Sequence, residues 1–443
     1  MAVKSVSDRR TVPILFSRAQ TSSAPMTVRA AVCGLLMGYS ACADVEQKLT
    51  TNDASVQDTP GREQPLPDDG KKDDQTKPPV NNVPDASKRP ADAASPASTR
   101  PDADTARPSD AGIVDASATT DASDASLENQ SDRCEVAKLD TAHRPETIPL
   151  SGSLGTHDPT AIESNGVYYS WNTGPRLPAK TSVDLRTWKD APSAFGTSNP
   201  AWVAKEVPGA TDLWAPDVSY FGGMFHLYYS ASTFSSNSSC IGHATRPSLE
   251  QGSWADKGPV VCSNHGTKDD WNAIDPNAFS DVEGKHWLTF GSFWSGIKAI
   301  ELDSSGARVG DRVYSLATRP PSVDGAIEAP ILVRRCGYYY LFASFDKCCV
   351  GNNSTYNIRV GRAKSVLGPF VDADGVSMLK GGGTLVVKGD SRYHGPGHNT
   401  VIFSGERAYN FYHAYDGQQN GRAVLRVAGL AWNDEGWPVS GGP

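Results

Sequence analysis

Five short segments rich in aromatic and β-branched residues recur along the chain from residue 167 onward. Successive segments start 53 to 70 residues apart, at Val167, Phe225, Lys285, Tyr338 and Ala408, and read VYYSWNTG, FHLYYSAS, KHWLTFGS, YYYLFASF and AYNFYHAY. Short runs of such residues are typical of buried β-strands. The pattern therefore predicts five equivalent strands.

A second strand precedes each aromatic segment. The turns between the two strands read ESNG, FGG, VEGK, RRCG and SGER, and the apolar runs before them read PTAI, PDVSYF, PNAFSD, PILVRR and NTVIFS. Apolar runs joined by glycine-containing turns indicate β-hairpins. A strand-and-turn unit that recurs five times predicts an all-β fold, a five-bladed β-propeller. The alternatives are a β-sandwich, which rarely extends over so long a segment, and a β-helix, whose repeats are shorter.

A polar residue stands where each of these first strands begins. Each lies 8 to 10 residues before its aromatic strand, and the five are Asp158, Asp217, Asp275, Glu328 and His398. Equivalent positions of propeller blades are related by rotation about a central channel, so we expect these side chains to meet around one mouth of it. A single carboxylate next to proline is more often a turn former, so the recurrence in five blades carries the argument.

A ring of carboxylates suits glycoside hydrolysis. Like charges held close together raise the pKa of one carboxyl, so one group stays protonated while another is ionised. The protonated group can donate to the leaving oxygen and the ionised group can activate water. Trp214, Trp271, Phe293 and Trp294 lie near the same strand starts and suit the faces of sugar rings, although most tryptophans of a propeller pack between blades. A metal site is compatible with this ligand set.

These motifs resemble those of the endo-1,5-α-L-arabinanases of glycoside hydrolase family 43. The match runs in order through residues 150–435 and includes THDPTAI, WAPDVSYF, NAIDPNAFSD, GSFWSGI, IEAPILVRRCGYYYLFASFDKCC, STYNIRVGRA and GPGHNTVI. The resemblance implies an inverting, endo-acting hydrolase of the α-1,5 linkages of arabinan. The alternatives are an exo-acting arabinanase, an α-L-arabinofuranosidase or a β-xylosidase of the same clan, and a non-catalytic propeller that captures arabinan.

The resemblance also implies roles for single residues. Asp158 corresponds to the general base, Glu328 to the general acid and Asp275 to the carboxylate that tunes and orients the acid. A calcium ion, or another hard cation, is expected beside His398, and no organic cofactor is expected. The residues expected to line the substrate subsites are Asp158, Trp214, Ser236, Asn272, Ala273, Ile274, Asp275, Ser292, Phe293 and Trp294. Ser235, Cys240 and Cys262 depart from the family pattern.

Composition divides the chain into three parts. No Phe, Tyr or Trp lies between Tyr39 and Tyr168, and all ten tryptophans lie at Trp171 or beyond. Residues 43–132, rich in Asp, Pro, Ala, Ser and Thr, cannot bury enough apolar area to offset the entropy of ordering, so a disordered acidic linker is expected. Residues 133–443 carry the propeller. They are close to neutral, which argues against a nucleic-acid partner.

Residues 1–42 are expected to be an export or lipoprotein signal. MTVRAAVCGLLMGYSACA contains one arginine, a short apolar stretch and small residues before Cys42, and this stretch is too short to span a membrane. YSAC resembles a lipoprotein signal in which Cys42 is lipidated, and ordinary signal-peptide cleavage is the alternative. We therefore expect an exported monomer, either a lipoprotein of the outer membrane or cell surface or a secreted enzyme.

Six cysteines fall within residues 133–443: Cys134, Cys240, Cys262, Cys336, Cys348 and Cys349. Their number fits an oxidising compartment, and the absence of a CxxC pair argues against a zinc site. We expect the adjacent Cys348 and Cys349 not to bridge each other, because a disulfide favours more widely separated Cα atoms. The pairing of the cysteines stays open.

Overall fold

The computed structural model describes residues 134–142, 144–264 and 269–443. The signal expected in residues 1–42, with Cys42, and the linker expected in residues 43–132 lie outside the described residues. The described part is dominated by β-structure and contains five sheets. Within it, no helix is long and apolar enough to cross a membrane.

The sheets follow one another along the chain as five blades. Blade 1 contains β2 Thr160–Ser164, β3 Val167–Trp171, β4 Ala179–Ser182, β5 Thr187–Ala191 and the parallel strand β1 Ser151–Gly152. Blade 2 contains β6 Trp214–Phe221, β7 Met224–Ala231, β8 Ser239–Arg246 and β9 Ala255–Ser263. Blade 3 contains β10 Asn277–Ser280, β11 His286–Phe290, β12 Ile297–Leu302 and β13 Tyr314–Ala317.

The last two blades complete the ring. Blade 4 contains β14 Ile327–Arg335, β15 Tyr338–Phe345, β16 Asn357–Ala363 and β17 Thr384–Lys388. Blade 5 contains β18 Tyr393–Ser404, β19 Arg407–Asp416, β20 Arg422–Trp432 and β21 Pro438–Ser440. Short helices lie in the connections: α2 Ala201–Glu206, η1 Pro321–Val323, η2 Gly351–Asn353, η3 Met378–Lys380 and η4 Gly417–Gln419.

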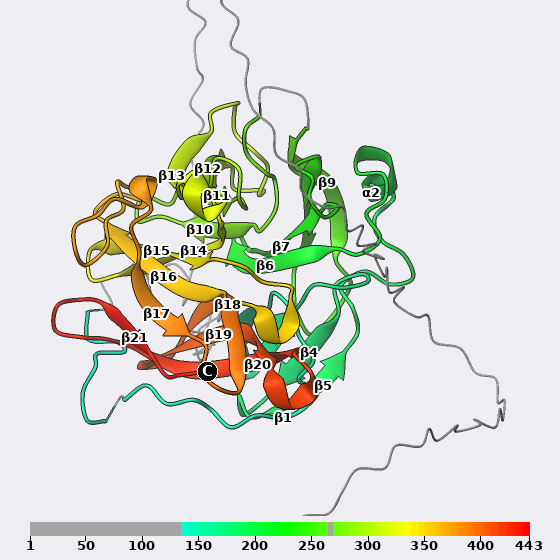
Figure 1. Cartoon of the computed structure of the whole chain (residues 1–443). Coiled ribbons are helices and arrows are strands. Elements are labelled where there is room, and N and C mark those ends of the chain that lie inside the picture. The colour runs from blue at the N-terminus through cyan, green and yellow to red at the C-terminus, as the bar shows by residue number, and fades with distance from the viewer. Residues whose placement is uncertain (1–133, 143, 265–268) are drawn as a thin grey trace, which may run out of the picture. The chain divides into compact units, whose positions relative to one another are not determined.

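The innermost strands of the blades form a closed circle. β2 contacts β6, β6 contacts β10, β10 contacts β14, β14 contacts β18, and β18 returns to β2. The predicted five-bladed propeller is thus confirmed (Figure 1). The five aromatic segments are β3, β7, β11, β15 and β19, the second strand of every blade.

The hairpin turns determine how the two innermost strands of a blade pair. In blade 1, Asn165 and Gly166 have φ of 52° and 73°, and in blade 4, Cys336 and Gly337 have φ of 51° and 68°. Two successive residues in the left-handed region match the twist of the flanking strands. The turn therefore fixes the register of the two innermost strands.

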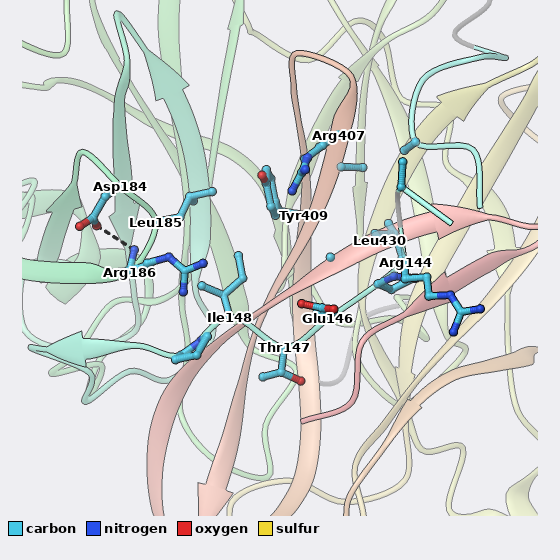
Figure 2. Close-up of a pocket in the computed structure, with 16 residues that line it drawn as sticks. Arg144, Glu146, Thr147, Ile148, Asp184, Leu185, Arg186, Arg407, Tyr409 and Leu430 are labelled. Carbon is cyan, nitrogen blue, oxygen red and sulfur yellow. Dashed lines mark hydrogen bonds between the residues drawn. The ribbon is translucent and has the colours of Figure 1, made fainter. Parts of the chain in front are cut away.

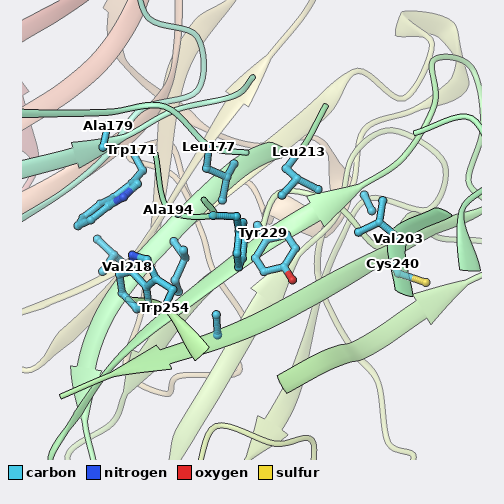
Figure 3. Packing of buried hydrophobic residues seen from close by; sticks show 14 of the residues in the cluster. Trp171, Leu177, Ala179, Ala194, Val203, Leu213, Val218, Tyr229, Cys240 and Trp254 are labelled. Atoms are coloured by element: carbon cyan, nitrogen blue, oxygen red, sulfur yellow. The ribbon is translucent and has the colours of Figure 1, made fainter. Parts of the chain in front are cut away.

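Apolar side chains fill the space between neighbouring blades. Trp171 of blade 1 and Val218 and Tyr229 of blade 2 belong to one buried cluster (Figure 3). Four more clusters occupy the other four interfaces between blades. Each fully buried large side chain contributes about 1.5–3 kcal/mol, so the aromatic second strands are what hold adjacent blades together.

Disulfides tie down several loops. Cys134 pairs with Cys336, which joins the start of the described chain to the hairpin turn of blade 4, and Cys240 pairs with Cys262 across β8 and β9. Cys348 pairs with Cys349. The expectation that these adjacent cysteines would not bridge is therefore wrong. They lie in the turn after β15, where Cys349 has φ of 69°. The expectation took account of the distance between the Cα atoms but not of this local backbone conformation.

Two buried histidines predict a loss of stability in acid. Nδ1 of His226 lies 2.9 Å from Nε2 of His243, and burial lowers the pKa of His226 to about 4 and that of His243 to about 3. His286, Lys257 and Asp303 are the charged groups that act on this pair. Because the folded pKa values lie below the ordinary histidine value, the unfolded chain binds more protons once the pH falls below about 6.5.

We expect the free energy of unfolding to decrease between pH 6.5 and pH 4, by about 3 kcal/mol for His243 alone. Urea unfolding at several pH values measures this decrease. His243→Gln keeps a donor for His226 and removes one titration, so its unfolding free energy should depend less on pH. Equal pH dependence in the variant and the wild type would contradict the assignment.

Candidate active site

Every innermost strand is preceded or interrupted by one residue with left-handed backbone. These residues have φ between 46° and 59° and are Asp158, Ala215, Asp275, Ala329 and His398. Each is followed by proline or, after His398, by asparagine. In blades 2, 4 and 5 the pairing register shifts at this point, as in a β-bulge. Such bulges re-aim a side chain, and non-glycine residues are held there only by surrounding contacts.

These five residues, and not the five predicted ones, are the equivalent positions. Asp158, Asp275 and His398 occupy the position itself, whereas Glu328 precedes it by one residue and Asp217 follows it by two. The expected register of five polar groups is therefore wrong for Glu328 and Asp217. The number of residues between each polar residue and its aromatic strand is similar in all five blades. Bulges change this number from blade to blade, so similar spacing did not mean an equivalent position.

Asp217 is separate from the other carboxylates. It accepts hydrogen bonds from Asn277 Nδ2 at 3.0 Å and from the N–H of Ala278 at 2.9 Å. With residues from all five innermost strands it lines a cavity of about 490 Å³ that none of the other ring residues lines. Burial raises the pKa of Asp217 to about 6. This carboxylate braces blade 2 against blade 3.

Side chains of the preceding blade hold the left-handed residues in place. In four blades the N–H of that residue donates to a side chain of the preceding blade. The pairs are Ala215 with Thr173 at 2.8 Å, Asp275 with Ser230 at 3.0 Å, His398 with Ser344 at 2.8 Å and Asp158 with His413 Nδ1 at 3.0 Å. In the remaining blade, blade 4, the N–H of Ala329 donates to Asp275 Oδ2 at 3.1 Å. The sequence analysis missed Thr173, Ser230, Ser344 and His413, which lie near the ends of four of the five aromatic segments.

Asp158 is held as a carboxylate. Its Oδ2 lies 2.8 Å from His157 Nδ1 and accepts from Thr173 Oγ1 at 2.6 Å, and its Oδ1 lies 3.2 Å from His398 Nδ1. Burial acts to raise the pKa of Asp158, but His157 and His398 hold it well below the ordinary value. Burial acts in the opposite sense on His398, whose pKa is raised to about 9 by Asp158. At neutral pH Asp158 is therefore ionised.

The pKa of Glu328 is shifted in the opposite direction to that of Asp158. Burial raises its pKa, and hydrogen bonds from Ser292 and Tyr356 offset only part of that effect. Ser292 Oγ donates to Oε2 at 2.6 Å and the hydroxyl of Tyr356 donates to Oε1. Ser292 also forms a bridge with the backbone of Glu328. This carboxyl is thus oriented by two hydroxyl groups and retains its proton to a higher pH than Asp158.

Asp275 is the third buried carboxylate of the site. Burial raises its pKa well above the ordinary value, and the charges of Glu328 and Asp158 raise it further. Its Oδ2 accepts the N–H of Ala329, the residue after Glu328. Asp275 therefore fixes the backbone that carries Glu328 and couples to it electrostatically. The three carboxylates that the sequence predicted as a catalytic set lie in one electrostatic cluster.

The predicted substrate residues differ in exposure. Trp294 is 43% exposed, and Trp214 packs against Phe234, which is 78% exposed, with 5.0 Å between ring centroids. Phe234 was missed, although an aromatic residue in the polar loop STFSS was a usable signal. Ser236 and Phe293 are half-buried. Phe293 donates its backbone N–H to Ile327 O, beside Glu328.

Three other predicted substrate residues are buried. Asn272 is 2% exposed, Ala273 has no exposed surface and Ile274 is 8% exposed. The N–H of Ala273 donates to Ser263 Oγ, and Ile274 O accepts the N–H of Gly291. These contacts support Asp275 and the loop that carries Ser292. Direct contact of the three with substrate stays a prediction.

A second cavity lies away from the carboxylates. It has a volume of about 190 Å³ and is lined by Ala142 and residues 144–149 together with parts of blades 1 and 5, including Arg186, Arg407 and Tyr409 (Figure 2). None of the predicted site residues lines it. The candidate active site therefore rests on its buried carboxylates, and not on this cavity.

Comparisons with known proteins identify the family. The family model for glycosyl hydrolases family 43 matches residues 151–438. The chain is 43% identical over 287 residues to an extracellular endo-α-(1→5)-L-arabinanase of Bacillus subtilis, covering 64% of this chain and 86% of that protein. It is 39% identical over 301 residues to an extracellular exo-α-(1→5)-L-arabinofuranosidase of Cellvibrio japonicus, again covering 64% and 86%.

A solved structure supports the same assignment. The α-L-arabinanase of Cellvibrio cellulosa complexed with arabinohexaose has a TM-score of 0.62 and 37% sequence identity, over 65% of this chain and 96% of that chain. The matches cover the propeller and its site. The chain belongs to glycosyl hydrolases family 43.

Proposed function

We propose that the protein is an exported endo-1,5-α-L-arabinanase that hydrolyses internal α-1,5 linkages of arabinan with inversion of configuration. The observation that carries this proposal is the different surroundings of the two buried carboxyl groups. Histidines contact Asp158 and lower its pKa, whereas Glu328 is held by two hydroxyl groups and burial raises its pKa. An ionised base and a protonated acid in one site are what inverting hydrolysis requires. The endo-arabinanase from Bacillus subtilis and the arabinohexaose complex support arabinan as the substrate.

In the proposed mechanism each carboxylate has one task. Asp158 removes a proton from the attacking water as the C–O bond to the leaving sugar breaks. Glu328 gives its proton to the leaving oxygen. Burial and the charge of Asp158 oppose its ionisation before the reaction, and Asp275 orients it by accepting the N–H of the next residue, Ala329. The exposed rings of Phe234 and Trp294 and the half-buried ring of Trp214 offer faces on which sugar rings can pack.

Endo action is distinguished from exo action by the products. The exo-acting relative from Cellvibrio japonicus makes exo cleavage the second candidate. On linear 1,5-arabinan, endo cleavage should lower viscosity steeply before much reducing sugar appears, and it should release a mixture of oligosaccharides. Release of one short product in proportion to the viscosity loss would favour the exo enzyme. Binding without any cleavage would favour a non-catalytic propeller.

The cation expected beside His398 is part of the proposal. The residues fit a hard cation, because His398 is 6% exposed, lies next to the carboxylate of Asp158 and has a second ring nitrogen beyond the one that faces this carboxylate. His398 would hold the ion through that nitrogen as a neutral imidazole, so binding of the ion would displace the second proton of the ring. A bound ion would supply positive charge that offsets the buried carboxylates.

Removal of the cation should lower both the rate and the melting temperature. A chelator should reduce kcat severalfold and reduce Tm, and added calcium should restore both. His398→Ala should show the same losses and no response to calcium, while Ser344→Ala, which removes only a hydrogen bond to the His398 backbone, should still respond. If the positive charge beside Asp158 is a histidinium and no metal is bound, the chelator will have no effect although His398→Ala still loses activity.

Lipid attachment at Cys42 is the proposed form of anchoring. Extracellular relatives support export, and YSAC precedes the long acidic segment of residues 43–132. Cys42→Ala should move the protein from the membrane fraction to the soluble fraction, without a change in specific activity. Cys33→Ala, in the same segment, is the matched control. An unchanged distribution would indicate an ordinary secreted enzyme.

A further inference from the structure

A chain of hydrogen bonds connects the disulfide-bonded turn to the proposed catalytic base. The backbone N–H of Cys349 donates to the hydroxyl oxygen of Tyr415 at 2.7 Å, and this oxygen lies 2.8 Å from His157 Nε2. The other ring nitrogen, Nδ1, lies 2.8 Å from Asp158 Oδ2. The sulfur of Cys349 also lies 3.8 Å from His157 Nε2. The turn and the base are therefore linked through two side chains.

The first member of this chain sets its direction. A backbone N–H can only donate, so the oxygen of Tyr415 accepts from Cys349, and Ser354 is a further hydrogen-bond partner of this hydroxyl. With one acceptor position occupied by the Cys349 amide, the hydroxyl of Tyr415 is available to direct its own proton to His157 Nε2. His157 then carries its proton on Nδ1 and donates it to Asp158 Oδ2. The turn thus selects one of the two tautomers of His157.

A second chain of the same type ends on the same oxygen. The N–H of Ala215 donates to Thr173 Oγ1 at 2.8 Å, and Thr173 Oγ1 lies 2.6 Å from Asp158 Oδ2. Because Thr173 already accepts from a backbone N–H, its hydroxyl is available to donate to Asp158. Two donors therefore engage Oδ2, while His398 Nδ1 lies 3.2 Å from Oδ1, so partners on both oxygens fix the orientation of this carboxylate.

We propose that Tyr415 and the disulfide-bonded turn Cys348–Cys349 act as a positioning device for Asp158, and that opening this disulfide slows hydrolysis. The role of Asp158 on which this depends is the one given under the proposed function. Cys349 is exposed and Cys348 half-buried, so a small dithiol can reach the bond. Reduction breaks the S–S bond, adds one proton and one electron to each sulfur, and converts the dithiol to its own disulfide. The freed turn no longer holds the Cys349 amide against Tyr415.

The first test removes the hydroxyl group from the relay. Tyr415→Phe should lower kcat by about 10- to 100-fold, the effect expected from a misplaced catalytic group, with little change in KM. The loss should be equal on arabinan and on an aryl arabinoside, because a defect of the base does not depend on the leaving group. Tyr412→Phe is the matched control: it lies on the same strand, β19, and its hydroxyl bonds Gly442 O away from the site.

The second readout reports the tautomer directly. In protein labelled with ¹⁵N-histidine, the wild type should show His157 protonated on Nδ1, and Tyr415→Phe should show a mixture of both tautomers. A His157→Gln variant assigns the signal. This readout does not need activity, so it still tests the relay if the proposed arabinanase function fails. An unchanged His157 spectrum in Tyr415→Phe would overturn the proposal.

The third test opens the disulfide. After treatment with a dithiol, and with free Cys348 and Cys349 verified by mass spectrometry, kcat should fall to the level of Cys348→Ser/Cys349→Ser and recover on reoxidation. That double variant should not respond to the dithiol, whereas Cys240→Ser/Cys262→Ser, which lacks a different disulfide, should respond like the wild type. Full activity with the Cys348–Cys349 bond demonstrably open would overturn the proposal.

Discussion

Glu328→Gln should nearly abolish cleavage of arabinan while leaving much more activity on an aryl arabinoside. Glu328 is buried, is oriented by Ser292 and Tyr356, and has a raised pKa, so it is the group that can protonate a leaving oxygen. Loss of a general acid lowers the rate about 10²- to 10⁴-fold when the leaving group is a basic sugar alkoxide. A phenol with a low pKa leaves without that proton.

Initial rates of the wild type and of Glu328→Gln, each measured on arabinan and on the aryl arabinoside, give this comparison. Glu163→Gln, a change of a β2 carboxylate that lines the cavity of Asp217 and lies outside the catalytic set, is the matched control and should retain activity on both substrates. If Glu328→Gln loses both activities equally while it folds like the wild type, Glu328 is not the acid.

Asp158→Asn should lose activity by a similar factor on both substrates. Asp158 is ionised because His157 and His398 lower its pKa despite its burial, which is the state needed to take a proton from water. The attacking water lacks its base in this variant whatever the leaving group is, so an aryl substrate brings no rescue. The expected loss is again on the order of 10² to 10⁴.

The assigned roles require that Glu328→Gln and Asp158→Asn respond differently to the change of leaving group. Circular dichroism and Tm should be measured for both, because Asp158 also accepts hydrogen bonds from its neighbours. Rescue of Asp158→Asn by the aryl leaving group, as large as that of Glu328→Gln, would mean that the roles are assigned wrongly.

The repeated elements of the fold were predictable from the sequence. The segments that begin at Val167 and Tyr338 coincide with the starts of β3 and β15, because a glycine-containing turn and an alternating apolar strand leave little choice of boundary. Asp158 and Asp275 were also placed correctly in the equivalent position. Their left-handed backbone next to proline is a local feature that sequence can carry.

The positions that were not predictable from the sequence depend on tertiary contacts. Glu328 lies one residue before the equivalent position of its blade and Asp217 two residues after it, since bulges alter the spacing. The hydroxyl groups of Thr173, Ser230 and Ser344 reach the next blade, a distance that no local pattern encodes.

The electrostatic roles needed the structure as well. Asp158 and Glu328 are both buried carboxylates, and only their partners, histidines for one and hydroxyl groups for the other, separate their pKa values. The contact of Tyr415 with His157 depends likewise on the packing of blade 5 against blade 1, and the contact of Cys349 with Tyr415 depends on the packing of blade 4 against blade 5.

The anomer of the first sugar released tests the central claim most directly. Linear 1,5-arabinan should be incubated with the wild-type enzyme and followed by ¹H NMR within the first minutes, before mutarotation. An acid and a base on opposite sides of the bond, with water between them, predict inversion, so the β-anomer of the new reducing end should appear first and the α-anomer only later. Initial release of the α-anomer would contradict the roles assigned to Asp158 and Glu328, and no release of any reducing end would contradict the function itself.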